Sequence, residues 1–186
     1  SASDDSKSTR REFLQSAGAA AVTTAFGPAI LNASDKSGSK MKLVGEGDYQ
    51  YECHHGWGKM PDHIVWGETH GVAVDANGLV YIKHRSHAPE PMDAVAVFDA
   101  EGKFVRSFGK KYHGGGHGIN IRKDGSEEFR CLGDVKHGIV EKTTLTGEVV
   151  WSKGRPKEPG VYDDPAARWS PTNVAFSADG GFYIGD

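Results

Sequence analysis

Histidine gives this chain its clearest chemical potential. The 186 residues include 9 histidines, and a neutral imidazole is a common metal ligand and a group that exchanges protons near neutral pH. The most obvious cluster, Cys53-His54-His55, is a poor site for one ion, because immediately adjacent residues lack the spacing of metal ligands. Three others lie in predicted loops or beside glycine and are assigned no site: His63, His87 and His113.

Two other histidines, His70 and His117, occupy the same position in a repeated pattern. Residues 69–82, 116–125 and 171–184 align with their apolar residues and turn glycines in register. Each unit opens with alternating apolar residues, which indicates a half-buried strand, and a glycine turn then predicts a second strand. The coinciding positions are Val72, Ile119 and Val174 for the apolar residues, and Gly78, Gly125 and Gly180 for the turns.

Further strands are predicted between the repeated segments. Residues 94–98 and 104–108 complete the first unit, and residues 138–142 and 148–151 complete the second. Four short strands recurring about every 50 residues are typical of a β-propeller blade. We therefore expect an all-β fold, with residues 41–186 forming the first half of a six-bladed propeller and ending within a blade. The alternative is a β-sandwich in which the similarity of the units arises by chance.

Composition agrees with a β-rich fold and excludes some functions. The 25 glycines are nearly twice the average usage and indicate many tight turns. A net charge of −3 argues against nucleic-acid binding, for which a strongly basic face is expected. The 2 cysteines, Cys53 and Cys131, are too few for a disulfide scaffold. Whether they pair in an oxidising compartment is left open by the sequence.

The amino-terminal residues resemble a twin-arginine export signal. Arg10 and Arg11 precede Phe13 and Leu14, and a weakly apolar stretch without charge follows. Its most apolar part, residues 17–31, contains Pro28 and is too short for a membrane span. We expect residues 1–33 to be the signal and 34–40 a flexible linker. The resemblance implies export through the twin-arginine machinery to the periplasm or the exterior, with no stable membrane span in the mature form.

The repeats resemble the NHL family of propellers, and within it the lyase domain of peptidylglycine α-amidating enzymes. The similarity covers residues 64–186 and rests on runs that come in the same order and at similar spacing. These runs are Gly-Val-Ala-Val-Asp at 71–75, His84-Arg85 after a predicted strand, the His-Gly step at His117, Pro-Thr-Asn-Val-Ala at 171–175, and the final Phe-Tyr-Ile-Gly-Asp at 182–186.

This resemblance implies a metal-dependent enzyme. These lyases split a peptidyl-α-hydroxyglycine, a carbinolamide, into a peptide amide and glyoxylate, using Zn²⁺ held by three histidines in the propeller channel. His117 matches the first zinc ligand, and the other two, with a catalytic Tyr, would follow residue 186. Arg85 matches a catalytic arginine that contacts the substrate. A Ca²⁺ ion held partly by backbone carbonyls maps onto Val72 and Ile119. The disulfide of that family does not match Cys53 or Cys131.

Each of these residues also has a structural interpretation. His117 could be satisfied by a neighbouring backbone carbonyl, and Arg85 could form a surface ion pair. His70 lies where the lyases have no zinc ligand, so it either contacts a metal ligand or the substrate or has no role in a site. His84 and His137 are predicted to be structural. Whether the protein is an enzyme is left open, and the alternative function is a non-catalytic NHL propeller that binds protein or glycan.

Overall fold

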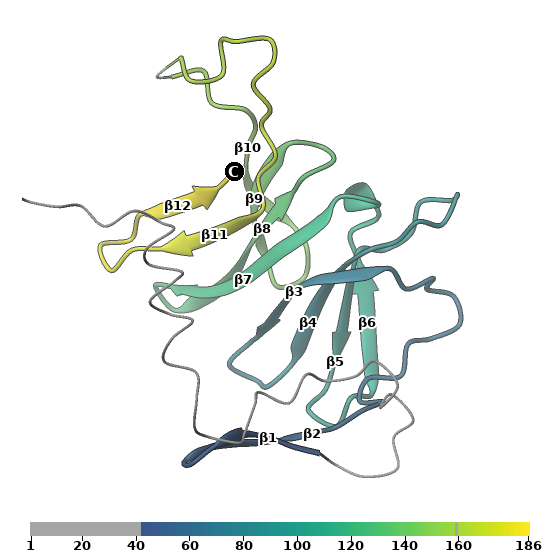
Figure 1. Cartoon of the computed structure of the whole chain (residues 1–186). Coiled ribbons are helices and arrows are strands. Elements are labelled where there is room, and N and C mark those ends of the chain that lie inside the picture. The colour runs from purple at the N-terminus through teal and green to yellow at the C-terminus, as the bar shows by residue number, and fades with distance from the viewer. Residues whose placement is uncertain (1–41, 159) are drawn as a thin grey trace, which may run out of the picture. The chain divides into compact units, whose positions relative to one another are not determined.

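The computed structural model describes residues 42–158 and 160–186 (Figure 1). The predicted signal and linker, residues 1–33 and 34–40, lie outside the described residues. The chain divides into two compact units, Ser1–His55 and Gly56–Asp186. In the first unit, strands β1 (Lys42–Glu46) and β2 (Tyr49–Cys53) form an antiparallel hairpin.

The second unit contains two four-stranded antiparallel sheets and one two-stranded sheet, each with its strands in chain order (Figure 1). The expectation of an all-β fold is therefore confirmed for the described residues. The first sheet consists of β3 (Glu68–Val74), β4 (Val80–Arg85), β5 (Val95–Phe98) and β6 (Phe104–Phe108). The second consists of β7 (Gly116–Asp124), β8 (Glu127–Asp134), β9 (Ile139–Thr144) and β10 (Val149–Lys153). The third consists of β11 (Asn173–Phe176) and β12 (Phe182–Gly185), and a short 3₁₀ turn, η2 (Lys110–Tyr112), connects the first two sheets.

The predicted turns form for a local reason. Asp75 accepts hydrogen bonds through its Oδ1 from the backbone N–H groups of Asn77 and Leu79, both at 2.9 Å. Gly78 then adopts a φ of 80°, which costs glycine little because it has no Cβ. The side chain of an aspartate thus fixes the turn, and the chain reverses directly into β4.

The first strands of successive sheets lie next to one another: β3 contacts β7, and β7 contacts β11 (Figure 1). Glycines permit this approach. A Cβ added to Gly71 would lie 2.7 Å from the Ile119 nitrogen, and one added to Gly118 would lie 2.7 Å from the Thr172 carbonyl oxygen. The Gly118 N–H also donates a 2.7 Å hydrogen bond to that carbonyl. Gly71 and Gly118, which directly follow His70 and His117, are therefore needed for close contact between the sheets.

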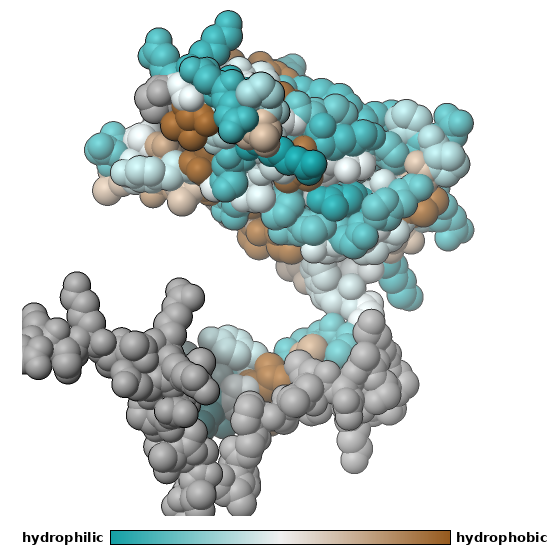
Figure 2. All heavy atoms as spheres, turned by 45° about the horizontal axis from the view of Figure 1, so that its top comes forward, coloured by the Kyte–Doolittle hydropathy of each residue, from teal (hydrophilic) through white to brown (hydrophobic). Residues whose placement is uncertain are grey.

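The core fills the space between neighbouring sheets. Tyr81, Val95 and Val97 of the first sheet pack with Ile119 of the second. A second cluster joins Cys131 and Val140 of the second sheet to Val174 of the third, together with partly buried aromatic residues. In the part of the surface seen in Figure 2, hydrophobic groups are scattered among hydrophilic ones.

Candidate metal and substrate site

His117 lies near the start of β7 and is half-buried. Its Nδ1 lies 3.0 Å from the Thr172 carbonyl oxygen, and a carbonyl can only accept, so Nδ1 carries the proton. The Nε2 lone pair is therefore available to bind a metal ion or accept a proton. In the structural interpretation of His117, a backbone carbonyl satisfies its ring. Metal-ligating histidines, however, are usually oriented by the same kind of contact. The hydrogen bond is thus compatible with both roles.

His70 occupies the matching position on β3, and its ring lies against that of His117. The ring centroids are 4.7 Å apart and the planes are tilted by 30°. Partial burial lowers the pKa of His70 below its usual value, and the charges of Arg85 and His117 lower it further, whereas Glu68 opposes the shift. Two imidazoles from neighbouring sheets therefore meet at this point.

Arg85 is the last residue of β4, not a residue that follows the strand, because the second strand runs three residues past the predicted end at Ile82. It is half-buried, and its Nε atom is buried without a hydrogen-bond partner. Among the ion pairs within residues 42–158 and 160–186, none includes Arg85. Its cross-strand neighbour Glu68 instead binds His87, with an Nε2–Oε2 distance of 2.7 Å. The guanidinium thus has capacity for an anion beside His70.

The two residues expected to offer carbonyls to calcium lie on neighbouring first strands. Val72 pairs with Ile82 across the first sheet, and Ile119 pairs with Leu132 across the second. The Val72 side chain is exposed, whereas Ile119 is buried in the core. Calcium binding at these carbonyls stays a prediction.

Side chains of the described residues do not form a complete metal site by themselves. No group of three or more His, Cys, Asp or Glu residues that could hold a metal ion occurs in this part of the chain. In the first unit, Cys53 Sγ lies 3.5 Å from His55 Nε2, while His54 pairs with Glu52. Zinc at His117 would therefore need ligands from other residues, as the resemblance implies.

Neither a scan of protein-family models nor a search of curated proteins finds a match to this chain. The described residues also contain no helix long and apolar enough to span a membrane.

His84 and His137 have the structural roles expected of them. His84 is fully buried and stacks on Trp66, with centroids 4.6 Å apart. Its Nε2–H donates to the Asp93 carbonyl at 3.0 Å, and burial lowers its pKa. The His137 ring binds the Asp134 carboxylate at 3.0 Å in the turn after β8.

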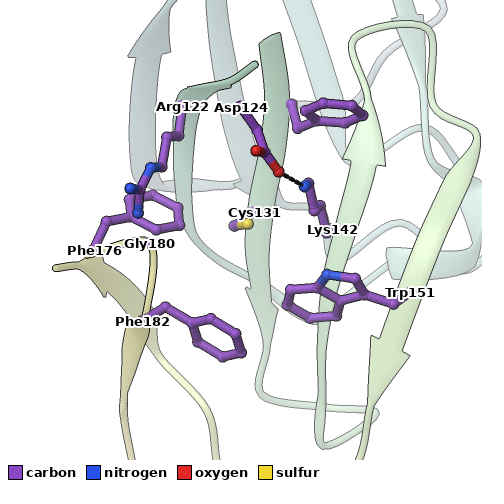
Figure 3. A pocket seen from close by; sticks show the side chains of 9 residues that line it. Arg122, Asp124, Cys131, Lys142, Trp151, Phe176, Gly180 and Phe182 are labelled. Carbon is purple, nitrogen blue, oxygen red and sulfur yellow. Dashed lines mark hydrogen bonds and ion pairs between the residues drawn. The ribbon is translucent and has the colours of Figure 1, made fainter. Parts of the chain in front are cut away.

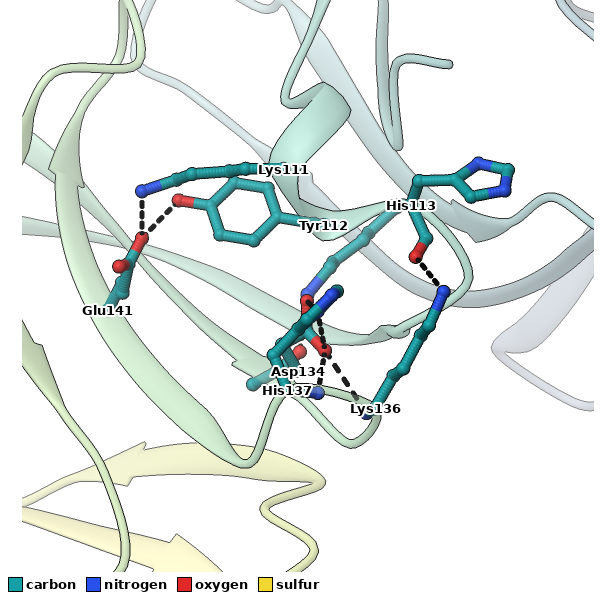
Figure 4. A network of polar contacts seen from close by, with 9 residues as sticks. Lys111, Tyr112, His113, Asp134, Lys136, His137 and Glu141 are labelled. Atoms are coloured by element: carbon teal, nitrogen blue, oxygen red, sulfur yellow. Dashed lines mark hydrogen bonds and ion pairs between the residues drawn. The ribbon is translucent and has the colours of Figure 1, made fainter. Parts of the chain in front are cut away.

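A buried polar network between the first two sheets was missed by sequence reasoning (Figure 4). Lys83 is fully buried on β4, and its Nζ donates to the Gly133 carbonyl on β8. On the second sheet, Glu141 accepts a hydrogen bond from Tyr112 and forms a 2.6 Å ion pair with Lys111. Burial lowers the pKa of Lys83 to about 8, although nearby carboxylates oppose the shift. Burial also raises the pKa of Tyr112, with Glu141 adding to the shift.

A cavity of about 230 Å³ lies between the second and third sheets (Figure 3). Trp151 and Phe182 stack in its wall with centroids 5.2 Å apart. At its rim Lys142 pairs with Asp124 at 2.5 Å. Cys131 lies at the bottom and is only 3% exposed.

Cys131 is expected to react slowly in the folded chain. Both cysteines are free, and burial raises the pKa of Cys131 to about 11, so little nucleophilic thiolate forms at neutral pH. In a Cys53→Ser variant, iodoacetamide labelling at pH 8 should be at least about tenfold slower in buffer than in urea. Mass spectrometry at timed intervals measures both rates. Equal rates would show that Cys131 is accessible in the folded chain.

Proposed function

We propose that the successive sheets belong to an NHL-type β-propeller and that the protein is an exported, metal-dependent lyase acting on peptidyl-α-hydroxyglycine substrates. Support for the propeller comes from the repeat of four antiparallel strands and from the lateral contacts of β3, β7 and β11. Support for export comes from Arg10-Arg11 and the apolar stretch that follows.

The observation that carries the enzymatic proposal is the convergence of Arg85 and His117 on His70. The His70 and His117 rings lie side by side, and a Cβ added to Gly116, the residue before His117, would lie 3.0 Å from the Arg85 backbone nitrogen, so Arg85 is next to the two rings. Arg85 brings a permanent positive charge with a buried, unpartnered Nε. His117 brings a free Nε2 held in place through its Nδ1 contact with Thr172. A charged donor and an imidazole nitrogen are thus available to one ligand.

The substrate has groups that fit these residues. Its terminal carboxylate would be bound by the Arg85 guanidinium, whose planar donors suit a carboxylate and stay charged at any working pH. His117 would hold zinc, which supplies Lewis acidity that lowers the pKa of a bound hydroxyl. In the overall reaction, the carbinol C–N bond breaks, the hydroxyl oxygen becomes the aldehyde oxygen of glyoxylate, and the proton ends on the amide nitrogen. A general base would carry that proton.

The direct test is glyoxylate release from a hydroxyglycine-capped peptide by the full-length protein with Zn²⁺ and Ca²⁺ present. Chelation should abolish release, and added metal should restore it. Arg85→Ala should lower kcat/KM by about 30-fold or more, since losing one partner of a desolvated charge pair costs about 2–5 kcal/mol. Arg122→Ala, at the cavity between the second and third sheets, is the matched control and should retain activity. No release at any metal load would contradict the lyase and favour a binding propeller.

A further inference from the structure

The contact between His70 and His117 is not explained by the resemblance. The lyases have no zinc ligand at the His70 position, yet in this chain the rings lie 4.7 Å apart between centroids. They come from β3 and β7, which belong to different sheets. Gly71 and Gly118, each directly after a histidine, allow the backbones around them to approach closely. The packing of the sheets therefore brings the two imidazoles together.

The separation of the rings fits shared ligation of one ion. Two imidazoles bound to one metal at Zn–N distances of about 2.0 Å, with a roughly tetrahedral angle, hold their ring centres about 5 Å apart. The observed 4.7 Å is close to that value, so the spacing of the two rings suits binding to one ion. His117 is already held by the Thr172 carbonyl through Nδ1, which leaves its Nε2 for the ion.

We propose that His70 and His117 together bind a single Zn²⁺ or Cu²⁺ ion, so that His70 is a second metal ligand. Imidazole nitrogens suit both ions. The inference rests on metal binding at His117 in the proposed function, but it needs no lyase activity. Glu68 is paired with His87 and is not counted as a ligand. His70 and His117 therefore supply two nitrogens, and water, substrate or other residues would fill the remaining coordination positions.

The charge of Arg85 gives the site a specific signature. Arg85 pairs across the first sheet with Glu68, two residues before His70, and its backbone nitrogen lies beside Gly116, the residue before His117. A fixed positive charge next to the two rings repels a bound cation. Arg85→Gln should therefore strengthen metal binding, whereas the proposed substrate role requires the same change to weaken turnover. A role for Arg85 in positioning the histidines would instead weaken both.

Copper binding to the complete chain tests the pair. Electron paramagnetic resonance of the first equivalent of Cu²⁺ should show two histidine nitrogens. His70→Ala and His117→Ala should each weaken Zn²⁺ binding about 100-fold, as measured by calorimetry. Each change leaves only one of the two imidazoles to bind the ion, so the advantage of simultaneous binding is lost. The double variant should be little weaker than either single variant. His63→Ala, an exposed ring beside Phe104, should leave the affinity unchanged.

The outcomes separate this inference from the proposed function. Unchanged affinity in His70→Ala, or one nitrogen in the copper spectrum of the unmodified chain, would overturn His70 as a ligand while leaving zinc at His117 intact. Unchanged affinity in both single variants would overturn the metal pair and the zinc assignment. Two nitrogens without glyoxylate release would support the pair and contradict the lyase. The nitrogen count is made on the unmodified chain, so it stands even if a variant fails to fold.

Discussion

Replacing Asp134 with alanine should lower the free energy of unfolding by about 2–4 kcal/mol, because the change removes a buried carboxylate that favours the charged form of Lys83 and accepts hydrogen bonds in the turn after β8. Asp134 is fully buried, and so is Lys83. Of the charges around Lys83, Asp134 acts most strongly to keep it protonated against the effect of burial. Without that carboxylate, the Lys83 ammonium loses its main compensating charge between the sheets.

The same substitution also removes hydrogen bonds from the turn after β8. Asp134 Oδ1 accepts from the backbone N–H groups of Lys136 at 3.1 Å and His137 at 2.9 Å, as Figure 4 shows. Asp134→Asn keeps an oxygen for this turn but removes the charge, so its effect should isolate the interaction with Lys83. The folded pKa of Lys83, about 8, lies below that of an unfolded lysine. The cost of Asp134→Asn should therefore be larger at pH 7 than at about pH 9.5, where folded Lys83 is mostly neutral.

Urea unfolding followed by tryptophan fluorescence measures these changes. The matched control is Asp124→Asn, since Asp124 is exposed and pairs with Lys142, and such pairs contribute at most about 1 kcal/mol. Lys83→Met combined with Asp134→Asn should recover much of the loss, because an apolar side chain needs no counter-charge. Equal stability of Asp134→Ala and the unmodified chain would show that the network does not stabilise the packing of the two sheets.

The strands and turns were predictable because their signals are local. Alternation of apolar residues around Val72 and Ile119 identifies half-buried strands, and a glycine at 78 or 125 marks a required positive φ. These features depend on residues a few positions apart. The end of β4 was predicted less well: His84 and Arg85 are polar, so the apolar pattern stops before the strand does.

The buried polar network around Lys83 and the contact between His70 and His117 were harder to predict from the sequence than the strands and turns. Lys83 follows Tyr81 at strand spacing, which was a signal that its side chain faces the core. The sequence does not show that Gly133 would accept its hydrogen bond, because that contact joins two sheets. The contact between His70 and His117 likewise depends on how the sheets pack. The shared repeat position shows only that the histidines are equivalent.

Gly118→Ala should destabilise the chain by about 1–3 kcal/mol, the usual cost of forcing extra volume into a packed core, and weaken metal binding as well. A Cβ at this position would lie 2.3 Å from Asn173 Oδ1 and 2.7 Å from the Thr172 carbonyl oxygen. The Asn173 side chain can rotate away, but the Thr172 carbonyl is backbone. Relief of the contact therefore requires β7 and the segment before β11 to separate.

The separation of β7 from the segment before β11 would affect both the stability of the fold and metal binding at His117. The Thr172 carbonyl accepts hydrogen bonds from both the Gly118 N–H and His117 Nδ1, so moving it releases the imidazole. Loss of such an orienting contact typically costs 10–100-fold in metal affinity. Gly154→Ala is the matched control, because the nearest atom to its added Cβ is 4.0 Å away. Urea unfolding and zinc calorimetry on both variants measure the two effects, and normal zinc affinity in a destabilised Gly118→Ala chain would show that Thr172 does not orient His117 for metal.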